Sequence, residues 1–197
     1  MAVAVTASSG GGAVGDPGAA GELGAAAWDG SRIVYAGGVG PDGLAGDVLA
    51  LDGEEWTEVG ALDEPREHVA AASDGQGRVW VLLGRTGGLD SNLSGVELVE
   101  GGTVRTLGEL PTARGGVAGF HHPAVGACVV GGESPDATFA EVECMDADGA
   151  VTVLPELSVA RHGLGAAVVE GTAYVGLGGP QPRLTVSPML EALRLDG

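Results

Sequence analysis

One short motif recurs in this chain at a nearly fixed interval. An arginine is followed by small and apolar residues at Arg66, Arg114 and Arg161, which are 48 and 47 residues apart. An earlier copy at residues 22–27 has Ala20 in the arginine position. A repeat of this length predicts an array of one supersecondary unit, because a single copy could not bury its own apolar face.

The first complete repeat divides into four short runs separated by turn residues. These runs are Leu23–Trp28, Arg32–Ala36, Asp47–Leu51 and Glu54–Val59, with a loop rich in Gly, Pro and Asp at 39–46. Runs of about 4 to 8 residues bounded by turn signals are typical of strands. We therefore predict an all-β chain with a four-stranded antiparallel sheet in each repeat. The 38 glycines agree with this prediction, since many tight turns need positive φ angles.

Three features of the repeat resemble the Kelch repeat of β-propellers. They are a strand ending in two glycines (Gly37-Gly38, Gly131-Gly132), a Trp on the last strand (Trp56), and a Leu-Pro or Pro-Arg connection (Leu110-Pro111, Pro65-Arg66). The resemblance covers residues 20 to 197. The second and fourth glycine pairs depart from the pattern, as Leu83-Gly84 and Gly176-Leu177-Gly178-Gly179, and Val104 and Val151 stand where Trp is expected.

The resemblance implies one β-propeller domain of four Kelch-like blades over residues 1–197. The blades are expected at 20–65, 66–113, 114–160 and 161–197. The last blade lacks a fourth strand after runs at Leu164–Val169, Ala173–Leu177 and Met189–Leu195. We expect the β-prone segment 2–7 to complete it, with 8–21 as a glycine-rich spacer. The alternative is that the N-terminus is a tail. We predict a closed monomer.

The charge of the chain limits its partners. Its formal net charge is -18, with nine arginines and no lysine. Such an acidic surface repels phosphate backbones and anionic bilayers, so we expect no nucleic-acid or membrane partner. The residues from Met1 to Ala7 lack the charge and length of a secretory signal, and no stretch is long and apolar enough to span a bilayer. We predict a cytoplasmic protein.

The sequence favours no catalytic, metal or cofactor site. His121-His122 is expected in a turn without further ligands nearby, and Tyr35 and Tyr174 are expected to pack on second strands. Cys128 and Cys144 are equally distant from Asp136, so a symmetric hairpin would bring them together. A cross-strand disulfide is one possibility, and two buried thiols are the preferred one.

The candidate ligand-binding residues open the first strands of the repeats. They are Arg66, His68, Arg114, Arg161 and His162. By resemblance to protein-binding Kelch propellers, they share one rim of the channel with the loops that follow the glycine pairs, which carry Asp42, Asp90, Asn92, Asp136 and Arg183. Arginine forks bind carboxylates, so the expected ligand is a protein, an acidic peptide or a carboxylated sugar. The alternative is that each arginine satisfies carbonyls or a carboxylate such as Glu67, Glu109 or Glu156.

These observations favour a non-catalytic recognition module of the Kelch type. Two other functions stay open. One is a sugar-processing enzyme of the sialic-acid epimerase kind, which requires acid and base groups converging in a polar pocket. The other is a structural role in which two chains form one eight-bladed ring, which requires apolar sheet faces exposed at both ends of the array.

Overall fold

The computed structural model describes residues 22–195, and its strands form four antiparallel sheets and one short hairpin. Sheet 1 contains β1 (Ala25–Trp28), β2 (Ile33–Ala36), β5 (Asp47–Asp52) and β6 (Glu55–Ala61). Sheet 2 contains β7 (Ala70–Ser73), β8 (Arg78–Leu82), β9 (Gly95–Glu100) and β10 (Thr103–Glu109). Sheet 3 contains β11 (Ala118–His122), β12 (Gly126–Val130), β13 (Val142–Met145) and β14 (Val151–Leu154). Sheet 4 contains β15 (Gly165–Val169), β16 (Thr172–Gly176) and β17 (Leu190–Arg194).

The expected all-β class is confirmed, and the strands of the first and last repeats lie where the sequence predicted them. The hairpin of β3 (Val39–Gly40) and β4 (Gly43–Leu44) was not anticipated, because its two strands are too short to show a pattern. None of the residues from 22 to 195 belongs to a helix that could cross a membrane. The proposed closing strand at 2–7 and the spacer at 8–21 lie outside the described residues.

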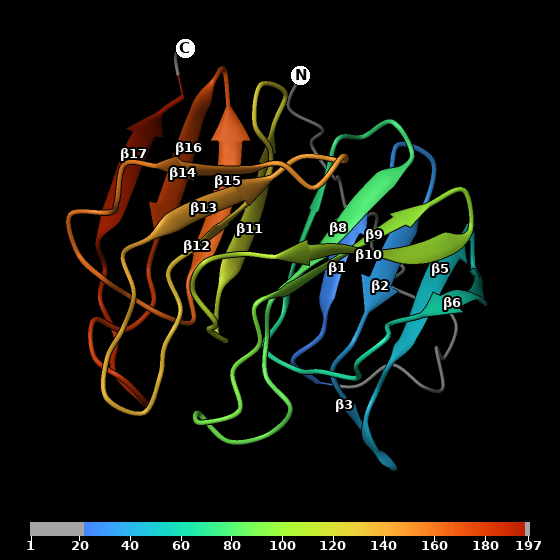
Figure 1. Cartoon of the computed structure of the whole chain (residues 1–197), viewed down its shortest axis with the longest axis horizontal. Helices are drawn as coiled ribbons and strands as arrows, with labels where there is room; N and C mark the ends of the chain where they lie inside the picture. Colours follow the sequence, from blue (N-terminus) through green and yellow to red (C-terminus); the bar gives the residue numbers. More distant parts are fainter. Residues whose placement is uncertain (1–21, 196–197) are drawn as a thin grey trace, which may run out of the picture.

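The sheets follow one another in chain order, from sheet 1 at the right of Figure 1 to sheet 4 at the left. Their first strands lie side by side, because β7 contacts β1 and β11, and β11 contacts β15. No comparable contact joins β15 to β1 among the described strands. The four sheets therefore form a curved array whose two end sheets are not packed together.

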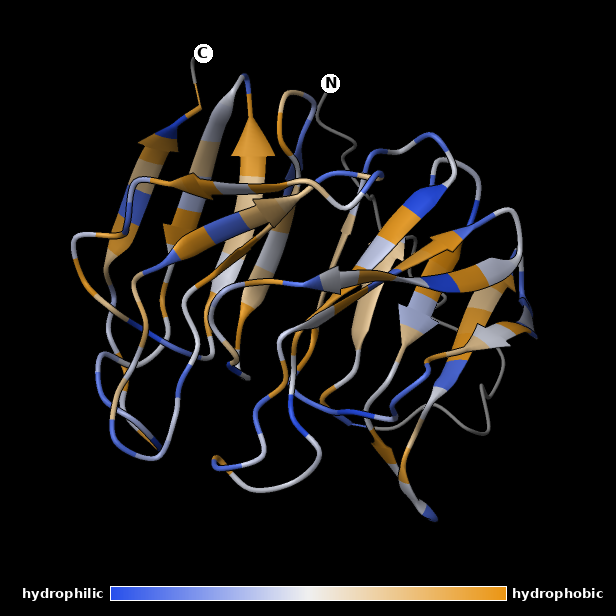
Figure 2. Ribbon diagram, viewed as in Figure 1, coloured by the Kyte–Doolittle hydropathy of each residue, from blue (hydrophilic) through white to orange (hydrophobic). Residues whose placement is uncertain are grey.

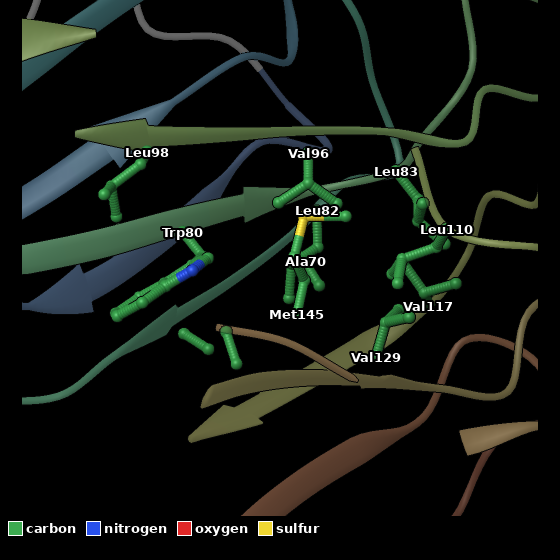
Figure 3. Packing of buried hydrophobic residues seen from close by; sticks show 12 residues of the cluster. Ala70, Trp80, Leu82, Leu83, Val96, Leu98, Leu110, Val117, Val129 and Met145 are labelled. Carbon is green, nitrogen blue, oxygen red and sulfur yellow. The ribbon is translucent and has the colours of Figure 1, made fainter. Parts of the chain in front are cut away.

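Three separate apolar cores hold neighbouring sheets together. Alternate residues of each strand point to opposite faces, and the buried apolar residues of each inner sheet belong to the clusters on both of its sides. Figure 2 shows the hydrophobic residues along the strands of the sheets. The core between sheets 2 and 3 contains Trp80, Leu83 and Met145 (Figure 3). Val34 and Val79 belong to the core between sheets 1 and 2, and separate clusters of this kind are expected for stacked repeats.

The same backbone conformation recurs at the end of every second strand. Two consecutive residues have positive φ in each repeat: Gly37-Gly38, Leu83-Gly84, Gly131-Gly132 and Leu177-Gly178. A Cβ on Gly131 would lie 2.5 Å from the carbonyl oxygen of Arg161, so this approach requires glycine. The fourth pair is therefore Leu177-Gly178, and two repeats keep a left-handed leucine where the others have glycine.

A chain of hydrogen bonds also links equivalent backbone positions of successive sheets. The His68 N–H donates to the Leu23 carbonyl, the Gly116 N–H to the His68 carbonyl, and the Gly163 N–H to the Gly116 carbonyl, at 2.8 to 3.0 Å. All four residues have positive φ. Because Leu23 and His68 hold equivalent places in this series, the residues before them, Glu22 and Glu67, are equivalent too. Glu22 is bridged to Val39 as Glu67 is bridged to Arg85. The expected match of Ala20 to Arg66 was therefore wrong by one residue.

Two other expectations are corrected. Cys128 and Cys144 face each other on β12 and β13 and form a disulfide, so the preferred interpretation as two thiols was wrong. The hairpin is symmetric about Asp136, which brings the two residues into register. His121 lies on β11 and not in a turn, with its ring centroid 5.4 Å from that of Trp80 in sheet 2.

Candidate functional site

Three of the five predicted binding residues are arginines that lie inside the sheets. Arg66, Arg114 and Arg161 are at most 2% exposed. Each forms an ion pair with a glutamate on the third strand of its own sheet: Arg66 with Glu97, Arg114 with Glu143 and Arg161 with Glu191. We call these three pairs the arginine clamps.

Each clamp joins three segments of its repeat. In sheet 3, the Arg114 guanidinium donates to the carbonyl oxygens of Gly131 and Glu141, which lie beside β12 and β13, at 2.7 and 3.4 Å. The paired Glu143 carboxylate accepts a hydrogen bond from the Thr112 hydroxyl in the connection from sheet 2. Glu191 accepts the Ser158 N–H in the same way, at 2.6 Å. The clamps therefore fix sheets 3 and 4 to the incoming chain, and Glu97 accepts the Asp63 N–H in the same way in sheet 2.

Sheet 1 lacks both members of the clamp. Leu49 occupies the position of Glu97, because it pairs with Tyr35 as Glu97 pairs with Val81. Neither residue 20 nor residue 21 is an arginine. The two charges are thus either present together or absent together, as expected for a buried pair in which each charge compensates the other.

The arginines consequently follow the structural alternative foreseen in the sequence. They satisfy carbonyls and a carboxylate, although the glutamates are not the sequence neighbours Glu67, Glu109 and Glu156. Their guanidinium groups are enclosed and neutralised in this structure, so they offer no free fork to an anion.

The other two predicted residues, His68 and His162, belong to a polar group that the sequence did not reveal. We call it the rim cluster, and it consists of Glu67, His68, Arg85, Glu133 and His162. Arg85 lies between the carboxylates of Glu67 and Glu133, with N–O distances of 3.3 and 3.4 Å. His162 Nδ1 lies 3.4 Å from Glu133 Oε1. The cluster thereby joins residues of sheets 2, 3 and 4 where their first strands begin.

The protonation state of His68 follows from its contacts. Arg85 Nη2 lies 2.8 Å from His68 Nε2, and because a guanidinium only donates, Nε2 accepts and Nδ1 carries the proton. Partial burial lowers the pKa of His68, and the positive charge of Arg85 lowers it further. His68 is therefore a neutral side chain that is held between charged groups.

Two of the predicted loop residues reach the rim cluster. The Asn92 side-chain amide donates to the Glu133 carbonyl at 2.7 Å, and the Arg183 backbone N–H donates to Glu133 Oε2 at 2.8 Å. Both loops therefore lie beside Glu133 of the rim cluster. Asp42, Asp90 and Asp136 are exposed on the same set of loops.

The rim cluster could have been found from the positions that directly follow the glycine pairs. These are Val39, Arg85, Glu133 and Gly179, which are bridged to the residues after the arginine positions: Glu22, Glu67, Gly115 and His162. Of the four residues that follow the glycine pairs, only Arg85 and Glu133 are charged. Because the residue types differ among repeats, a search for repeated residues passes over them.

The structure contains two hollows of similar size. The first strands of all four sheets line a space of about 380 Å³, beyond the rim, where His121 is the one titratable lining residue among those described. A second, mainly apolar hollow of about 370 Å³ lies between the end of β14 and β17, lined by Val125, Leu154 and Leu193 among others. This second hollow borders the outer edge of the three-stranded sheet.

Neither hollow brings together the acid and base groups that the epimerase-like alternative requires. Within residues 22–195, no group of three or more His, Cys, Asp and Glu side chains is placed to hold a metal ion. In comparisons with known proteins, no family model matches the chain, and no curated protein matches it either.

Proposed function

We propose that the chain is a Kelch-like β-propeller module without catalytic activity that recognises a cationic segment of a protein or peptide at its rim. The support for the fold is the repeated glycine-pair conformation and the regular order of sheets around their first strands. The support for the site is the rim cluster, the polar group in which side chains of three sheets meet.

The sign of the partner's charge follows from where the arginines are. Six of the nine arginines are already paired with carboxylates of the chain: Arg32, Arg66, Arg78, Arg85, Arg114 and Arg161. The unpaired carboxylates therefore determine the potential outside the molecule. An acidic potential speeds the encounter with cationic partners and disfavours anionic ones.

The rim itself has an excess of carboxylates. Glu22, Glu67 and Glu133 occupy equivalent or bridged rim positions, and Arg85 is the cation paired with two of them. The exposed Asp42 and Asp90 lie in loops that follow the glycine pairs. Glu67 and Glu133 are only 8% and 5% exposed and are paired with Arg85, so a lysine or arginine of a partner would reach them by displacing Arg85. We therefore prefer a basic segment to the acidic peptide or carboxylated sugar expected from the sequence.

The proposal is tested with two labelled peptides, oligoarginine and oligoglutamate, by fluorescence anisotropy. We expect measurable binding of oligoarginine and none of oligoglutamate. The variants Glu67→Gln and Glu133→Gln should each weaken oligoarginine binding at least about threefold. The control variants Glu58→Gln and Glu100→Gln remove the same charge at exposed positions on β6 and β9.

The controls separate a specific site from general attraction. Equal weakening by all four variants would mean that the peptide senses net charge alone, which would overturn the rim as the site. Preferential binding of oligoglutamate would overturn the proposed charge of the partner. Circular dichroism of each variant verifies that the sheets are intact.

A further inference from the structure

Each sheet has two faces, one toward the next sheet in the chain and one toward the preceding sheet. We call them the forward face and the back face. On the second strands, Val34, Trp80 and Cys128 belong to the forward faces of sheets 1 to 3, and Tyr174 holds this position in sheet 4. Ile33, Val79, Ala127 and Ala173 hold one position on the back faces.

The forward face of sheet 4 is apolar and exposed at positions that are buried in the other sheets. Leu190 is 67% exposed, whereas its counterparts Val48, Val96 and Val142 are fully buried. Leu177 is 64% exposed, whereas Leu83, which has the same left-handed conformation, is fully buried in the core between sheets 2 and 3 (Figure 3). This face therefore has the composition of a sheet junction and no partner among the described residues.

The back face of sheet 1 shows the complementary exposure. Ile33 is 38% exposed, whereas Val79, Ala127 and Ala173 are at most 1% exposed. Trp28, beside Ile33 in the register, is 57% exposed. Exposed large apolar side chains on contiguous strands mark an interaction surface.

The side chains of the two end faces match as they do at an existing junction. Between sheets 2 and 3, Trp80 on the forward face contacts His121 on the back face, with ring centroids 5.4 Å apart. Tyr174 occupies the position of Trp80, and Trp28 occupies the position of His121. Docking sheet 4 onto sheet 1 would thus pair two aromatic rings where the chain already pairs two rings.

The backbone offers one further match. In the chain of hydrogen bonds that links the sheets, the Leu23 N–H and the Gly163 carbonyl are the two ends, and neither bonds to the other. A sheet 4 placed before sheet 1 would bring this donor to this acceptor, as His68 N–H is brought to the Leu23 carbonyl.

We propose that the two end faces bind each other between two copies of the chain, so that two arrays close into one ring. The forward face of sheet 4 in each copy packs on the back face of sheet 1 in the other, which gives two identical junctions related by a two-fold axis. The interface continues the three junctions already present, with an apolar core, a Tyr174–Trp28 contact and the Leu23–Gly163 hydrogen bond. Closure within one chain would have buried Trp28 and Leu190, which are exposed.

Engineered cysteines test which faces meet. In the described residues the only cysteines are paired as Cys128–Cys144, so new thiols report without interference. An equimolar mixture of Trp28→Cys and Tyr174→Cys chains, oxidised mildly, should give a covalent species of two chains, and either variant alone should give much less. A double variant that links within a single chain would overturn the proposal in favour of closure of one array.

Sedimentation of the unmodified chain provides the second measurement. We expect the mass of two 19.3 kDa chains at micromolar concentration. Leu177→Glu and Leu190→Glu should each abolish this species, whereas Val153→Glu, at an exposed position on the outer strand of sheet 3, should leave it unchanged. A wild-type monomer up to submillimolar concentration would refute the proposal, as would equal loss of the dimer in the Val153→Glu control.

Discussion

Arg114 and Glu143 form a buried ion pair with an N–O distance of 2.7 Å, and it recurs in sheets 2 and 4 but is replaced in sheet 1, where Leu49 stands in the glutamate position. The chain thus contains its own comparison between a charged and an apolar solution to the same packing problem. Stability measurements can exploit this comparison directly.

We expect Glu143→Leu to destabilise the fold by about 3 to 5 kcal/mol, because it leaves the buried Arg114 charge without a partner. The double variant Arg114→Met/Glu143→Leu, which imitates sheet 1, should recover at least about 1 kcal/mol of this loss. Urea denaturation of wild type and both variants measures the difference. A double variant less stable than the single one would show that the arginine hydrogen bonds to carbonyls outweigh the charge pair.

Reduction of the Cys128–Cys144 disulfide should lower the stability of sheet 3. The bond closes a loop with a sequence separation of 16, for which loss of the cross-link is expected to cost about 3 kcal/mol. Thermal unfolding with and without reductant measures the effect, and the Cys128→Ala/Cys144→Ala variant should be insensitive to reductant. An unchanged midpoint in the wild type would contradict the expectation.

The disulfide also favours an oxidising compartment, which is a different environment from the cytoplasm predicted from the sequence.

Acidification below neutral pH should destabilise the chain through His68 and His121. Burial lowers the pKa of both below the ordinary value of 6.5, with nearby arginine charge adding to the effect. The unfolded chain therefore binds more protons, and stability decreases as the pH falls below about 6.5. Urea midpoints from about pH 7.5 to about pH 5.5 measure this slope. The His68→Asn/His121→Gln variant should have a flatter profile; an equal slope would assign the effect to other groups.

Leu83 and Leu177 should respond in opposite ways to glycine. Both have left-handed backbones, at φ of 56° and 65°, which glycine adopts without the cost of about 1 to 2 kcal/mol paid by other residues. Leu83→Gly also empties a site in a core and should be destabilising by about 2 kcal/mol or more. Leu177→Gly should stabilise the isolated chain by about 1 kcal/mol while weakening dimerisation. Denaturation at low and high protein concentration separates the two effects of Leu177→Gly.

The sequence predicts the parts of the fold that depend on periodic pattern. The runs around Ile33 and Ala173 contain β-branched and aromatic residues and lie between turn residues, so their strands were placed correctly. The positive φ angles at Leu83 and Leu177 could not be predicted from the sequence, because leucine rarely adopts this conformation. Likewise, the sequence showed that Arg66 occupies a repeated position, but it did not identify its partner Glu97, which lies 31 positions away. Pairing at that distance depends on the register of the strands.

The rim cluster was harder to predict for another reason. Arg85 and Glu133 hold equivalent positions but carry opposite charges, and their contact arises only where two neighbouring sheets meet. Repetition in the sequence reveals what every sheet needs for its own folding. Contacts that differ from one junction to the next produce no repeated sequence pattern, although such contacts can give the chain its binding specificity.

The hydrogen-bonded series from Leu23 to Gly163 has a consequence for how such chains change in length. Each added sheet uses one donor and one acceptor that any neighbour can match, whatever its side chains. Duplication or deletion of a whole repeat therefore preserves this backbone pairing, and only the side chains at the new junction must adapt to each other.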